Sequence, residues 1–101
     1  MDLETMQANA AQASALLKSL SNPSRMLVLC ALMNREHTVG ELEELTGLSQ
    51  SAISQHMARL RDEGIVATRR EAQWIYYSLV DEAVKAILET MHRLYCPEEY
   101  L

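Results

Sequence analysis

The chain has 101 residues, of which 49% are hydrophobic and 23% are charged, so it has room for one domain core and lacks the composition of a disordered protein. Only three glycines and two prolines are present, which favours a helical chain with short loops. No apolar run approaches the roughly 20 residues of a membrane-spanning helix. The first residues do not resemble a secretory signal, so we expect a cytoplasmic protein with no membrane partner.

The net charge of −5 is unusual for a protein that binds nucleic acid, but the charges are unevenly distributed. Residues 49–77 carry four arginines and three acidic residues, a net charge of +1, whereas the segments before and after them each carry −3. This distribution is compatible with a middle segment that faces DNA and acidic ends that face away from it.

Two helices are predicted in the first third of the chain. The segment 7–20 is rich in alanine and has a strong helix propensity. Asn22 and Pro23 then form a typical N-cap and first helical residue. The second helix is expected to run to about Asn34.

The next two predicted helices are short and lie close together in the sequence. Thr38 and Glu41 have the spacing of a capping box, which opens a third helix ending near Gly47. Ser49 is a typical N-cap for a fourth helix, which we expect to end at Gly64. Two short helices joined by a tight turn that contains glycine are typical of a helix-turn-helix.

The periodicity changes after the fourth helix. Residues 65–70 and 74–79 are rich in β-branched and aromatic residues and predict a hairpin. Residues 71–73 contain neither glycine nor asparagine, so we expect the tip to be longer than a two-residue turn. Asp81 then caps a last helix, which extends to about Tyr95 and carries apolar residues at helical spacing.

The predicted order of elements is α-α-α-α-β-β-α, a mainly α fold with a β-hairpin wing. We therefore expect residues 1–101 to form a single winged helix-turn-helix domain that binds DNA, with an extra helix at each end. The first and last helices cannot both bury their apolar faces in so small a core. A homodimer would cover both faces and place two recognition helices about one turn of DNA apart.

The fourth helix is the predicted recognition helix. At about 100° per residue, Ile53 and His56 fall on an apolar side, so we interpret His56 as more structural than base-reading. The other side carries short hydroxyl and amide side chains that suit a major groove, although an ordinary amphipathic surface helix is the alternative. The candidate DNA-binding residues here are Gln50, Ser51, Ser54, Gln55, His56 and Arg59.

The predicted hairpin supplies a second set of candidate DNA contacts. Arg69 and Arg70 lie on the strand that leads to its tip, and Gln73 lies just beyond. As a wing, these residues would contact the DNA backbone or enter a minor groove. The alternative is a solubilised edge strand, because charges on an edge oppose aggregation.

Several segments together resemble the ArsR/SmtB family of bacterial repressors, namely residues 20–25, 48–60, 64–66 and 74–79. The resemblance implies a homodimer joined through the first and last helices. It also implies repression through an imperfect palindrome in double-stranded DNA, relieved when an inducer is sensed. Ala72 and Gln73 differ from the Gly-Arg that is common at the wing tip of the family.

The resemblance also bears on what is sensed. The third helix lacks the family's Cys-x-Cys motif, and the last helix lacks its Asp-x-His pair, so neither usual metal site is predicted. Cys30 in the second helix and Cys96 at the end of the last helix resemble a dithiol branch of the family, the BigR- and HlyU-like regulators. This implies that reactive sulfur species or other oxidants bridge the two thiols and weaken DNA binding.

Three alternatives remain open. Cys30, His92 and Cys96 are candidate ligands for a soft metal or trivalent arsenic, in a metal-responsive repressor. A Cys–His pair is also compatible with catalysis, but no Gly-rich loop or carboxylate pair accompanies it, so we expect no enzyme and no cofactor. A dimer that binds a protein instead of DNA would leave the polar face of the fourth helix unexplained. Considered without Cys96, Cys30 would be interpreted as a small core hydrophobe.

Overall fold

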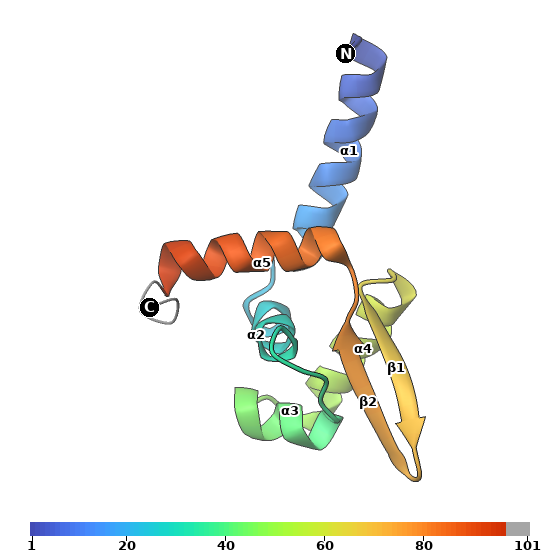
Figure 1. The fold of residues 1–101 in the computed structure, drawn as a ribbon, viewed down its shortest axis with the longest axis vertical. Helices are drawn as coiled ribbons and strands as arrows, with labels where there is room; N and C mark the ends of the chain where they lie inside the picture. Colours follow the sequence, from blue (N-terminus) through green and yellow to red (C-terminus); the bar gives the residue numbers. More distant parts are fainter. Residues whose placement is uncertain (97–101) are drawn as a thin grey trace.

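The computed structural model describes residues 1–96, which form five helices and one two-stranded antiparallel sheet (Figure 1). This arrangement confirms the predicted order of elements and the winged-helix fold class. The elements are α1 (Leu3–Leu20), α2 (Pro23–Leu32), α3 (Val39–Thr46), α4 (Gln50–Asp62), β1 (Val66–Glu71), β2 (Trp74–Leu79) and α5 (Glu82–Tyr95). Within the described residues, no helix combines the length and the apolar character needed to cross a membrane.

Three helix boundaries differ from the sequence-based expectation. α4 ends at Asp62 instead of Gly64. The first helix begins at Leu3, earlier than predicted, because the Asp2 carboxylate accepts a hydrogen bond of 2.8 Å from the Thr5 amide and caps the helix there. The second helix ends at Leu32 instead of near Asn34. All three differences fall at helix ends, which are the least reliable part of a sequence-based assignment.

The predicted long hairpin tip is wrong. Glu71 pairs with Trp74, so only Ala72 and Gln73 form the turn. Ala72 has φ 55°, in the left-handed region that a residue with a Cβ rarely adopts. Tight two-residue hairpins require such a φ, and the strand pairing on either side of the turn holds Ala72 in it.

The core lies between α2, α3, α4 and the base of the hairpin, and α5 lies across one side of it (Figure 1). α4 contributes Ile53, Met57 and Leu60, each with no exposed surface. The other buried apolar residues are Leu20, Val28, Leu29, Leu32, Leu42, Ile65, Val66, Leu79, Val84 and Leu88. Because one side of α4 is fixed in the core, its opposite side faces outward.

The helix α1 projects away from this core (Figure 1). Residues 1–15 are exposed along their whole length, and Leu20 is the one residue of α1 that is buried. The last turn is fixed by Ser19, whose carbonyl accepts a hydrogen bond of 2.6 Å from the Arg25 guanidinium. A mostly exposed helix with Leu3 and Leu17 on its surface leaves apolar area uncovered in the single chain.

The capping box of α3 provides a stability prediction. The Thr38 hydroxyl accepts a hydrogen bond from the Glu41 amide, and the Glu41 carboxylate accepts one from the Thr38 amide. Because α3 has only eight residues, we expect Thr38→Ala to lower the free energy of unfolding by about 1 kcal/mol in urea titrations. Ser14→Ala, at an exposed position within α1, is the matched control and should cost nothing, since alanine is the better helix former. Equal stability of the two variants would contradict the role of the cap.

Candidate nucleic-acid interface

The turn between α3 and α4 has the geometry of a helix-turn-helix. Gly47 ends α3 with φ 75°, and its amide donates a hydrogen bond of 2.9 Å to the Glu43 carbonyl. A left-handed residue at this position favours glycine. Ser49 then caps α4 by accepting a hydrogen bond of 3.1 Å from the Ala52 amide. Three residues thus connect the two helices, which pack against each other.

The outward side of α4 carries most of the candidate DNA-binding residues. Gln50, Ser51, Ser54 and Gln55 are all exposed and make no hydrogen bond through their side chains to another described residue. Ile53 lies on the opposite, buried side of the helix. Short hydroxyls and amides with unused donors and acceptors suit hydrogen bonding to base edges and phosphates.

His56 occupies the margin between these two sides of α4. It is half-buried, and this burial lowers its pKa below the ordinary histidine value, with a further contribution from the cations of Arg25 and Arg59. The imidazole is therefore neutral at neutral pH. The interpretation of His56 as more structural than base-reading stays a prediction.

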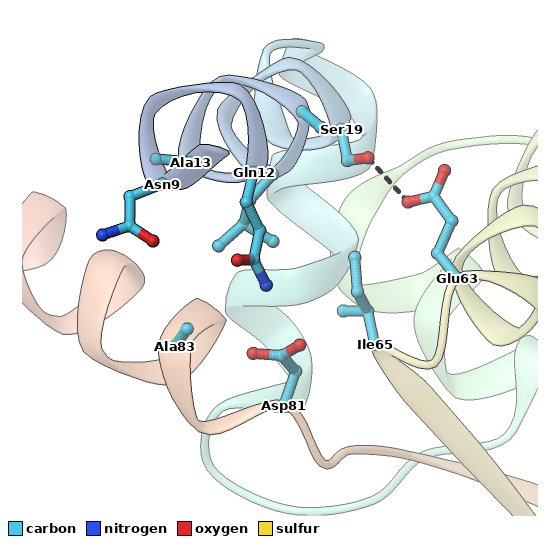
Figure 2. Close-up of a pocket in the computed structure, with 10 residues that line it drawn as sticks. Asn9, Gln12, Ala13, Ser19, Glu63, Ile65, Asp81 and Ala83 are labelled. Atoms are coloured by element: carbon cyan, nitrogen blue, oxygen red, sulfur yellow. Dashed lines mark hydrogen bonds between the residues drawn. The ribbon is translucent and has the colours of Figure 1, made fainter. Parts of the chain in front are cut away.

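The C-terminal end of α4 is connected to α1 through Glu63. The Arg59 Nε lies 3.2 Å from one Glu63 carboxylate oxygen, and the Ser19 hydroxyl donates a hydrogen bond of 2.6 Å to the other (Figure 2). The hydrogen bond from Ser19 is the main reason that the pKa of Glu63 lies below the ordinary value, and Arg59 adds to it. Sequence reasoning missed Glu63, because its partner Ser19 is distant in the chain.

The two wing arginines lie on opposite faces of the hairpin. In the register, Val66 pairs with Leu79, and both are buried, whereas Arg70 pairs with Ile75 near the tip. Because side chains alternate along a strand, Arg70 shares the face that enters the core at Val66, and Arg69 lies on the other face. Arg70 and Gln73 are exposed.

Arg69 is held by carboxylates within the chain. Its Nε lies 2.8 Å from both carboxylate oxygens of Glu36, and its Nη1 lies 2.9 Å from a Glu71 oxygen. The guanidinium also lies over the Tyr76 ring, 4.4 Å from its centre. Glu36 is the main reason that the pKa of Arg69 is raised, and Arg69 in turn lowers the pKa of Glu36. The sequence contained no signal for Glu36 as a partner.

The two cysteines lie on different elements and are both thiols. Cys30 is partly buried on α2 and packs against the core cluster, beside a groove of about 450 Å³ between α2 and α3. Cys96 is the C-cap of α5 and is also partly buried. Within residues 1–96, no three His, Cys, Asp or Glu side chains gather as a metal site. The three-ligand alternative with His92 is therefore not assembled in this single chain.

A second groove, of about 740 Å³, opens where α1 projects from the core. Figure 2 shows Asn9 and Gln12 on the α1 side and Asp81 and Ala83 at the start of α5. Ile65 lies at the base of the groove. The groove is wide and open, as expected of a surface between two projecting helices.

Comparison with known proteins relates this arrangement to bacterial regulators. Residues 22–68 match the family described as bacterial regulatory protein, arsR family. The chain is 53% identical over 97 residues to the HTH-type transcriptional regulator YgaV of Escherichia coli strain K12, covering 95% of this chain and 98% of that protein. Among solved structures, the reduced HlyU of Vibrio cholerae superposes with a TM-score of 0.87 at 50% identity, covering 93% of this chain and 99% of that one. The transcriptional repressor BigR of Xylella fastidiosa superposes with a TM-score of 0.85 at 36% identity, covering 95% and 98%.

Proposed function

Since the chain belongs to the arsR family of bacterial regulatory proteins and is a DNA-binding transcriptional regulator, not an enzyme, we propose that its reduced homodimer binds a palindromic operator and releases it when Cys30 and Cys96 are oxidised. The proposal that the protein binds an operator rests on the chemistry of the outward side of α4. Its polar side chains are exposed, uncharged and without partners among the described residues. A helix of this kind can approach base edges without repelling the DNA.

The proposed contacts divide by chemistry. Ser51, Ser54 and Gln55 read base edges in the major groove, with Gln50 at the start of the helix beside the backbone. Two exposed arginines supply phosphate contacts. Arg70 lies on the wing, and Arg59 lies at the flank of α4, where 59% of its side chain stays exposed beside Glu63. Gln73 at the hairpin tip is the remaining wing contact. His56 supports the helix from its half-buried side.

The dimer is proposed from the surfaces that the single chain leaves uncovered. Leu3 and Leu17 on α1, and Leu94 and Tyr95 at the end of α5, are each at least half exposed. A symmetric partner that packs against α1 and α5 would bury this apolar area and the groove between the two helices. The two copies of α4 would then face successive major grooves of a palindrome.

The proposed dithiol is supported by the chemistry of thiols, by the positions of the two cysteines and by the similarity of the chain to HlyU. In the reaction, one thiolate attacks the outer sulfur of an organic persulfide RSSH, which gives Cys–S–SH and RSH. The second thiolate displaces H₂S and closes a disulfide, so the two cysteines lose two electrons to the persulfide. A second RSSH would convert the other cysteine to Cys–S–SH as well; attack of one persulfide on the inner sulfur of the other then gives a Cys–S–S–S–Cys bridge and releases H₂S. The comparison with a structure described as reduced HlyU supports an oxidisable pair.

A bridge of this kind has a direct route to the DNA-binding surface. Cys30 is on α2, which packs against α3 and α4, and Cys96 ends α5. A covalent bridge between Cys30 and Cys96 would move α2 relative to α5. This movement would change the distance between the two recognition helices of the dimer. The required coupling is only about 1–3 kcal/mol.

Substitutions of the proposed base-reading residues test whether α4 binds the operator. We expect Gln55→Ala and Ser54→Ala each to weaken operator binding by about ten-fold or more, because each change removes contacts from both protomers. Fluorescence anisotropy with the native operator measures the affinity, and sedimentation measures the dimer, which should be unchanged. Gln7→Ala, the same chemical change on exposed α1, is the matched control, and sedimentation checks its dimer because α1 belongs to the proposed dimer surface. If both α4 variants bound the operator as the wild type does, the groove assignment would be wrong.

A further inference from the structure

The Arg69 side chain is 49% exposed, and its contacts with Glu36 point to a role for Glu36 other than contact with DNA. We propose that Glu36 is a positioning residue for DNA recognition: with Arg69 it fixes the wing against the start of α3 and leaves Arg70 as the wing's phosphate contact. The inference rests on the proposed function only in requiring that α4 and the wing bind DNA. It is independent of the two cysteines.

The clamp formed by Glu36, Arg69 and Tyr76 spans three chain segments. Arg69 is on β1, Tyr76 is its pairing partner on β2, and Glu36 lies in the connection between α2 and α3. The Nε contacts both Glu36 oxygens at 2.8 Å, and the Nη2 also bonds to one of them. The guanidinium thus crosses the Tyr76 ring to reach a carboxylate on the far side of β2.

The backbone next to Glu36 reinforces this connection. His37 pairs with Tyr77 as an antiparallel bridge, with N–H to carbonyl distances of 3.0 Å and 2.8 Å. This single bridge holds the backbone at His37 beside β2, outside the two-stranded sheet. Thr38 follows immediately and caps α3. The wing is tied in this way to the first helix of the helix-turn-helix, so its angle relative to α4 is set there.

The geometry of the clamp separates it from an ordinary surface ion pair. A single exposed pair is generally worth little, because water screens it and both side chains must be ordered. Here the carboxylate is bidentate and the cation also contacts an aromatic ring, the two features that add direction and strength. Arg70, on the other face, makes no ion pair with another described residue. One wing arginine is thus occupied within the protein, and the other is available.

The test compares the salt dependence of operator binding for the two arginines. Arg70→Gln should lower the slope of log K against log salt by about one per protomer, because a phosphate contact is lost. Arg69→Gln and Glu36→Gln should each weaken specific binding by about five-fold while the slope stays that of the wild type. The double variant should lose no more than either single one, because both act through the same clamp.

A lysine at position 69 distinguishes a residue that holds the wing in place from one that contacts the DNA through its charge. Arg69→Lys keeps the charge but loses the bidentate geometry, so it should behave like Arg69→Gln. A slope lowered by Arg69→Gln, or wild-type binding by Glu36→Gln, would overturn the proposal. Thermal unfolding of each variant shows whether the domain is folded. If Gln55→Ala and Arg70→Gln also left binding unchanged, the DNA assignment itself would fail together with this inference.

Discussion

Replacing Cys30 or Cys96 by serine should leave the operator complex intact at a polysulfide concentration that releases the wild-type protein. A single remaining thiol can take up sulfur but cannot close the bridge between α2 and α5. For the wild type, we expect oxidation to weaken operator affinity by about 5- to 150-fold, the range of ordinary allosteric coupling. Each variant should change by less than about two-fold, since it has no coupling to lose.

The measurement is operator binding by anisotropy before and after polysulfide treatment, with recovery in excess dithiol. Under reducing conditions both variants should match the wild type, which excludes a loss of folding as the cause. Because Cys30 packs against the core, Cys30→Ala is the matched control for the polarity of the serine hydroxyl. A variant that still released the operator normally would remove the dithiol from the mechanism.

Operator affinity should fall by about a hundred-fold between 50 and 200 mM salt, although the net charge of the chain is −5. Local phosphate contacts, and not the net charge, set the slope. With Arg59 and Arg70 in each protomer, four contacts release about four counterions. Arg59→Gln should lower this slope, as Arg70→Gln does. Lys18→Gln, an exposed cation on α1, should leave it unchanged. A flat salt response would favour the alternative of a protein partner.

The helix-turn-helix was predictable because its signals are local. Thr38 with Glu41, and Ser49 before α4, act within four residues, and the structure contains both caps. The apolar spacing of α4 likewise identified its outward side. The tip of the wing was predicted wrongly, because Ala72 adopts a conformation that its residue type disfavours. Strand pairing overrides that local preference, and no local signal indicates it.

The contacts that orient the elements were not predictable in the same way. Glu36 meets Arg69 only through the hairpin register and the bridge of His37 to Tyr77. Glu63 meets Ser19 only because α1 packs its last turn near the end of α4. Such contacts join distant parts of the chain, so they require the fold before they can be identified. The sequence indicated which residues carry the chemistry, and the structure adds what holds them in place.

If bridging Cys30 and Cys96 releases the operator, the bridge must be found in the released protein. Operator-bound and released protein are separated after polysulfide treatment, and each fraction is measured by peptide mass spectrometry. We expect peptides joined through Cys30 and Cys96, directly or with added sulfur, in the released fraction and none in the bound fraction. Released protein with both thiols unmodified, or bridged protein still on the operator, would contradict it.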